Sequence, residues 1–136
     1  MSSKAGVWID HRKAVVVTLD EDGDTVQTFL SEAEKPSRSS GGSHQAEPFG
    51  HQDVVAEDRR DHVYRQQLAR FYAQVADSLK AADAYYILGA GEAHKEFHHF
   101  LRDQAKLGDR VREVSAADKL SEQDIVAEVR RYFHRQ

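Results

Sequence analysis

The segment Ala84–Leu101, AYYILGAGEAHKEFHHFL, constrains the fold of this chain more than any other. Its apolar run Ala84–Leu88 has the length of a buried strand, and the glycine-rich turn Gly89–Gly91 follows directly. Phe97 and Leu101, four residues apart, then continue with the spacing of one helix face. A buried strand, a glycine turn and an amphipathic helix form half of a β-α-β unit, so the segment predicts an α/β fold.

The rest of the chain supplies further strands and helices around this segment. Runs rich in β-branched residues predict strands, and apolar residues three or four apart predict helices. The expected strands are Gly6–Asp10, Lys13–Leu19, Thr25–Leu30, Ala84–Leu88 and Arg110–Ser115, and the expected helices are Asp61–Ala82, Glu92–Lys106 and one opened by Ser121–Asp124. The order β-β-β-α-β-α-β-α predicts one domain over residues 1–136 with a mixed five-stranded sheet, because hairpins give antiparallel strands and crossovers give parallel ones.

Composition limits the classes of function. The 136 residues suit one domain, and the net charge of −4 means that any RNA contact needs a local basic patch. The chain has no cysteine, which excludes disulfides and thiolate zinc sites and agrees with a cytoplasmic protein. We expect no signal peptide and no membrane span, because no apolar run approaches the ~20 residues that a span requires.

Residues 31–60 break the strand and helix patterns. Both prolines and the Ser/Gly-rich run Ser37–Ser43 lie here, so we expect a long, mobile loop, of which Val54–Arg60 could already begin the next helix. Cations and imidazoles in such a segment can follow an RNA backbone, although acidic residues are interleaved with them. The candidate RNA contacts are Lys35, Arg38, His44, Arg59 and Arg60.

The order of elements is similar to that of a ribonuclease-H-like sheet. It also resembles the middle domain of archaeal and eukaryotic class I peptide-chain release factors and of their ribosome-rescue relatives. The opening VWIDHRKAVVV, Val7–Val17, resembles the first hairpin of small bacterial proteins grouped with that domain and labelled translational machinery or host-attachment proteins. The block ILGAGEAHKEF, Ile87–Phe97, resembles the glycine turn and helix of both groups. The resemblance covers nearly the whole chain except residues 31–60.

This resemblance implies a cytoplasmic, translation-associated factor that binds the ribosome or tRNA, with rescue of stalled ribosomes as one form of that role. In the release factors the loop before the long helix carries Gly-Gly-Gln, and here the corresponding residues are Gly41, Gly42 and Ser43. Serine cannot extend an amide toward the peptidyl-tRNA ester as glutamine does. The resemblance therefore does not decide whether this chain hydrolyses peptidyl-tRNA. The alternative is a non-enzymatic RNA- or protein-binding module on the same fold. No cofactor is implied, and an exposed third strand leaves pairing with a second copy open.

Three smaller patterns have both a functional and a structural interpretation. Gly89 and Gly91 before a helix could bind an anion such as phosphate, or could form a plain turn. His94 and His98, four apart on one helix, could bind a metal, although a solvated histidine face is the simpler interpretation. Asp10, at the end of the first strand, lies where ribonuclease-H-like nucleases place a metal-binding carboxylate, or it could instead cap a hairpin turn.

Overall fold

The computed structural model describes residues 3–33 and 50–134, without the side chains of 50–58. The order of strands and α-helices is the one expected from the sequence, with one short 3₁₀ helix added before the last strand. The elements are β1 (Lys4–Ile9), β2 (Lys13–Asp20), β3 (Gly23–Leu30), α2 (Gly50–Leu79), β4 (Ala84–Gly89), α3 (Ala93–Asp103), η1 (Gly108–Arg110), β5 (Val111–Ala116) and α4 (Glu122–His134).

The strands form the expected mixed sheet, in the order β3-β2-β1-β4-β5. β1 pairs antiparallel with β2, and β2 pairs antiparallel with β3, as two consecutive hairpins require. β1 and β4 pair in parallel, with Ile9 opposite Gly89, and β4 pairs in parallel with β5. The interior strand β4 is buried along its whole length, which explains why its sequence is a continuous apolar run rather than an alternating one.

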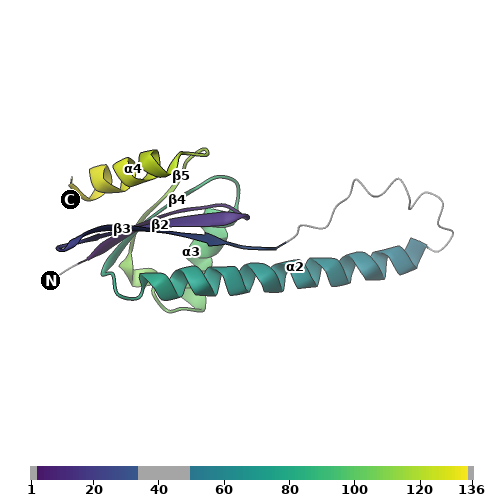
Figure 1. Ribbon diagram of the computed structural model, residues 1–136. Helices are drawn as coiled ribbons and strands as arrows, with labels where there is room; N and C mark the ends of the chain where they lie inside the picture. The colour runs from purple at the N-terminus through teal and green to yellow at the C-terminus, as the bar shows by residue number, and fades with distance from the viewer. Residues whose placement is uncertain (1–2, 34–49, 135–136) are drawn as a thin grey trace.

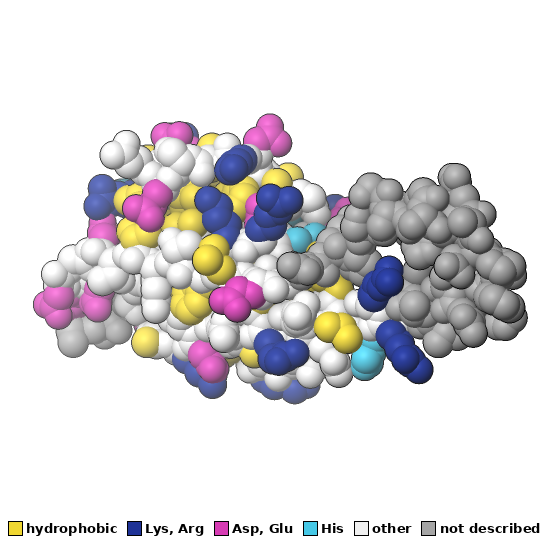
Figure 2. Space-filling view, turned by 45° about the vertical axis from the view of Figure 1, so that its right-hand side comes forward, with side chains coloured by type: hydrophobic (Ala, Val, Ile, Leu, Met, Phe, Trp, Pro, Cys, Tyr) yellow, Lys and Arg dark blue, Asp and Glu magenta, His cyan; other side chains and the backbone are white. Residues whose placement is uncertain are grey.

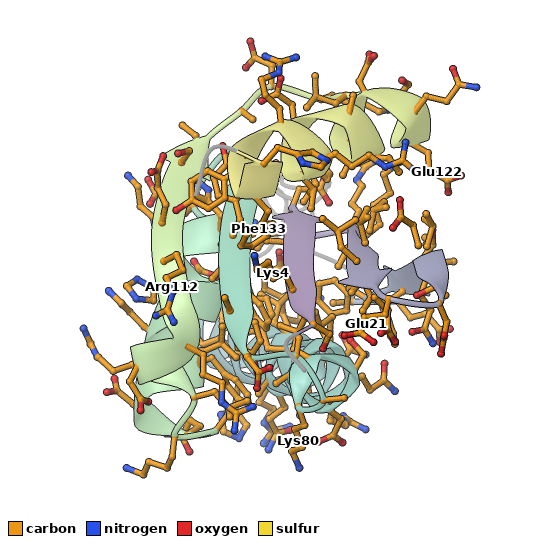
Figure 3. The ribbon with its side chains drawn as sticks, turned by 90° about the vertical axis from the view of Figure 1, so that its left-hand side faces the viewer. Lys4, Glu21, Lys80, Arg112, Glu122 and Phe133 are labelled. Carbon is orange, nitrogen blue, oxygen red and sulfur yellow. The ribbon has the colours of Figure 1, made fainter. Side chains whose placement is uncertain are left out.

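Helices cover both faces of this sheet. Figure 1 shows α2 and α3 on one side and α4 on the other. Successive residues of β1 point to opposite faces: Val7 packs in the α2 and α3 core, whereas Trp8 packs with Val129 of α4. Figure 3 shows α4 above the sheet, with Phe133 directed toward β1, and the Lys4 ammonium lies 5.7 Å from the centre of that ring.

The start expected for the long helix at Asp61 is wrong, because α2 begins at Gly50 and ends at Leu79. Its 30 residues span about 45 Å at 1.5 Å per residue, and its first half extends past the sheet (Figure 1). The first buried side chain described on α2 is Leu68. Within the described side chains of α2, none from residue 59 to residue 67 is buried, so this part of the helix lacks the burial that produces an apolar stripe in a sequence. Residues 50–60 therefore belong to a helix and not to the expected loop.

The edge strand β3 is largely exposed. β3 forms one edge, and its side chains Val26 and Leu30 are 40% and 62% exposed. Such an edge can pair with another strand, so the expected pairing with a second copy stays a prediction. No helix in the described part of the chain combines the length and the apolar character that crossing a membrane requires.

Candidate functional site

Two sets of candidate residues lie outside the described residues. They are the residues matched to the release-factor loop, Gly41, Gly42 and Ser43, and the candidate RNA contacts Lys35, Arg38 and His44. Their role in RNA contact or in catalysis therefore stays a prediction.

Arg59 and Arg60 lie on α2 and not in a loop, and both side chains are exposed. Arg65 and Arg70 add two further exposed guanidinium groups along the same helix. Figure 2 shows Lys or Arg side chains where the described surface meets the residues drawn in grey. A helix holds its side chains at defined spacings, so α2 presents these cations in a more ordered arrangement than a loop would.

Gly89 and Gly91 each have a structural role at the turn between β4 and α3. A Cβ atom on Gly89 would lie 2.2 Å from the backbone oxygen of Ile9 and 2.8 Å from His94 Cβ, so only glycine fits there. Gly91 has a φ of +68°, a left-handed conformation that glycine adopts without strain. Glu92 occupies the N-cap of α3 and places a carboxylate at the positive end of the helix dipole. The turn is explained without an anion, and anion binding stays a prediction.

The interpretation of a solvated histidine face is wrong for His94, which is only 3% exposed. Its Nδ1 atom is buried and has no hydrogen-bond partner among the described residues, whereas His98 is half-buried. Burial is the main cause that lowers the pKa of both imidazoles. Among the residues that the structure describes, no three or more His, Asp or Glu side chains gather as a metal site.

Asp10 caps the turn between β1 and β2. Its Oδ1 atom accepts hydrogen bonds of 2.7 Å from the Arg12 amide and 2.8 Å from the Lys13 amide. This is the Asx-type turn that the sequence offered as the simpler interpretation. The Asp10 carboxylate is thus engaged in the turn. Within residues 3–33 and 59–134, no group of three or more His, Asp or Glu side chains could hold a metal ion, so the hypothesis of a metal-dependent nuclease gains no support.

A constellation that sequence analysis missed joins the β1–β2 turn, α2 and α3. The Tyr72 hydroxyl donates a hydrogen bond of 2.7 Å to Glu96 Oε1, and His11 Nε2 lies 2.9 Å from the same oxygen. The Tyr64 ring meets the His11 imidazole edge-on, with 6.3 Å between ring centres. Burial, followed by the interactions with Glu96, raises the pKa of Tyr72 well above its usual value. Tyr72 is therefore a neutral donor at physiological pH.

These residues line a cleft of about 600 Å³ between α2 and α3, which we call the Glu96 cleft. Its walls include the apolar and aromatic side chains Tyr64, Leu68, Tyr72 and Phe100. The four-residue steps from Tyr64 to Leu68 and Tyr72, and from Glu96 to Phe100, place each set on one helix face. A second hollow of about 630 Å³ adjoins the cleft and shares His11 and Tyr64 with it.

Sequence patterns indicated only some of the residues that line this cleft. Tyr64 and Leu68 are four residues apart, a spacing that indicates which face of α2 turns inward but suggests only core packing. His11 and Glu96 are 85 residues apart, so no local spacing connects them. The position of Glu96, directly before the buried Phe97, was the one local indication of an acid near the core.

No family model matches this sequence, and no curated protein matches it either. The structure is similar to the Pelota protein of Thermoplasma acidophilum, with a TM-score of 0.53 and 17% identity over 100% of this chain. It is also similar to Pelota of Archaeoglobus fulgidus, with a TM-score of 0.54 and 14% identity over 95% of the chain. The archaeal translation termination factor aRF1 matches with a TM-score of 0.53 and 10% identity over 98% of the chain.

This chain shares a fold with a domain of these proteins. It spans only 33%, 31% and 39% of their respective lengths. The expected resemblance to a release-factor domain is thus confirmed as a resemblance of fold. Identities this low carry no residue-level correspondence, so the roles of individual side chains rest on the geometry above.

Proposed function

We propose that this chain is a cytoplasmic, translation-associated factor that binds the ribosome or tRNA. The observation that supports this proposal is the match of nearly the whole chain to a domain of Pelota and of a translation termination factor. This chain also has the order of strands and helices that the release-factor resemblance implied. The chain spans about a third of the length of those proteins, so the match concerns only part of each of them.

The basic side chains before and on α2 are the proposed contacts to RNA phosphates. Arg59 and Arg60 are exposed near the start of a helix that extends beyond the sheet, where a large partner could reach them. Lys35, Arg38 and His44 precede them in the chain. Because the whole chain carries a charge of −4, such contacts must act locally, and they should weaken as salt increases.

The test is co-sedimentation with ribosomes over a salt series. We compare the wild type with the triple variant Arg38→Ala, Arg59→Ala, Arg60→Ala. A matched triple variant, Arg112→Ala, Lys119→Ala, Arg131→Ala, removes three exposed cations from β5, the following loop and α4. We expect salt-sensitive binding that the first variant loses and the second retains. Absence of binding at every salt concentration, or equal loss in both variants, would overturn the proposal.

Ser43 favours binding without catalysis, because the glutamine of the Gly-Gly-Gln loop is missing. We therefore expect ribosome binding without release of peptide from peptidyl-tRNA. A release assay on stalled complexes tests this expectation, with a chain lacking residues 37–45 as the comparison. Release by the wild type that disappears in the shortened chain would instead assign catalysis to the loop.

A further inference from the structure

We propose that the Glu96 cleft binds a ligand that carries an ammonium or guanidinium group on an apolar stem. This inference does not depend on the proposed role in translation, since it rests on the cleft alone. The volume of about 600 Å³ lies within the range of ordinary small-ligand sites.

The walls of the cleft suit the stem and the charge of such a ligand. Leu68 offers an aliphatic surface, and Tyr64, Tyr72 and Phe100 offer aromatic rings. Tyr72 and Phe100 lie with their ring centres 6.1 Å apart, so the α2 wall and the α3 wall meet at these two rings. Aromatic faces attract alkylammonium and guanidinium groups, and their apolar surface packs against a methylene stem.

Glu96 provides a carboxylate whose position is fixed before a ligand arrives. Its Oε1 atom is held by Tyr72 from α2 and lies next to His11 Nε2 from the β1–β2 turn. Within the described part of the chain, the Oε2 atom has no hydrogen-bond partner, and the side chain is 45% exposed. A carboxylate with one oxygen anchored and the other free is a preorganised acceptor for a charged donor.

The charges around the cleft favour a cation over an anion. Glu96, Asp61 and Asp103 contribute three carboxylates, and Arg65 contributes one guanidinium group. Asp103 also pairs with Arg102, which offsets part of its charge. The remaining balance is negative when His11 and His99 are neutral, so phosphates and carboxylates are disfavoured at this site.

Two sources can supply this chemistry, a free polyamine or a lysine or arginine side chain of a protein partner. The probes are spermidine and the blocked tripeptide acetyl-Gly-Arg-Gly-amide. Each is titrated into the isolated chain and followed by ¹H–¹⁵N NMR. We expect saturable shifts centred on the amides of residues 64–72 and 96–100. Binding of spermidine alone would point to the polyamine, and binding of the tripeptide alone would point to a protein side chain.

The variant Glu96→Gln tests the assignment, because it removes the charge and keeps the shape of the side chain. We expect its dissociation constant to rise at least about fivefold, since a charge-assisted hydrogen bond becomes a neutral one. The matched control is Glu113→Gln, which neutralises an exposed carboxylate on β5 and should leave binding unchanged. If Glu96→Gln does not fold, Tyr64→Leu removes a half-buried wall of the cleft and should weaken binding in the same way.

Shifts that never saturate, shifts spread over the whole surface, or equal effects of Glu96→Gln and Glu113→Gln would overturn the inference. The measurement contains no ribosomes, so its failure is distinct from failure of the sedimentation experiment. A chain that binds ribosomes but neither probe would keep the proposed function and lose the cation site.

Discussion

The hydroxyl of Tyr72 donates a hydrogen bond of 2.7 Å to Glu96 Oε1, and this bond connects the C-terminal third of α2 to α3. Tyr72 is 5% exposed and packs against Phe97 and Phe100, so its ring is part of the core while its hydroxyl reaches the cleft. The same pair therefore supports both the packing of two helices and the orientation of the carboxylate in the Glu96 cleft.

Removing this hydroxyl should destabilise the fold modestly. We expect Tyr72→Phe to lower the free energy of unfolding by about 1 kcal/mol, because Glu96 is half-exposed and water can replace part of the bond. Urea unfolding of Tyr72→Phe, Glu96→Ala and the double variant measures the coupling between the two side chains. Strictly additive effects would show that the bond contributes nothing.

The two glycines between β4 and α3 should differ sharply when replaced by alanine. Gly89→Ala places a Cβ against the Ile9 carbonyl within the β1–β4 pairing, and we expect a loss of about 3 kcal/mol. At Gly91 a Cβ atom would meet no neighbouring atom, so Gly91→Ala only strains the left-handed backbone. We expect it to lower the free energy of unfolding by about 1 kcal/mol. Urea midpoints compare the two variants. A larger loss for Gly91→Ala would contradict the packing role of Gly89.

Stability should fall in mild acid because of His94. Burial lowers the pKa of the folded imidazole below its usual value of 6.5. Below pH 6.5 the unfolded chain takes up a proton that the folded chain resists, so the free energy of unfolding falls until the pH reaches the folded pKa. Above pH 6.5 both states are neutral at this site and the effect vanishes. His98 is half-buried and its pKa is also lowered, so it contributes a further decrease in the free energy of unfolding over the same range of pH.

Unfolding measured at pH 7.5 and at pH 5 checks this expectation. We expect His94→Leu to lose less stability between the two values than the wild type does. His99→Gln alters an exposed histidine on the same helix and serves as the control. An equal loss in His94→Leu and the wild type would show that another group dominates the pH dependence.

The cap of the last helix should contribute measurably to stability. Ser121 Oγ accepts a hydrogen bond of 3.1 Å from the Asp124 amide, so Ser121 caps the helix where the sequence predicted its start. We expect Ser121→Ala to cost about 1 kcal/mol, and Ser121→Asp to be nearly neutral because aspartate caps equally well. Thermal unfolding of both variants is the measurement, and equal destabilisation would contradict a capping role.

The sequence was a reliable guide wherever local pattern and burial coincide. Ala84–Leu88 predicted a buried strand because parallel strands covered on both faces require continuous apolar residues. Ser121 predicted the start of α4 because a cap is a local hydrogen bond. The start of α2 was missed because its first turns lie beyond the sheet, where burial imposes no periodicity.

By itself, the sequence determined the α/β class, the order of elements and the mixed sheet, because each depends on short-range periodicity and on chain connectivity. Only the tertiary structure decided that Gly89 packs against Ile9, that His94 is buried, and that Glu96 meets Tyr72 and His11. These contacts join residues from separate elements. The distances between these residues depend on how the helices pack on the sheet, and the spacing of residues along the sequence does not predict that packing.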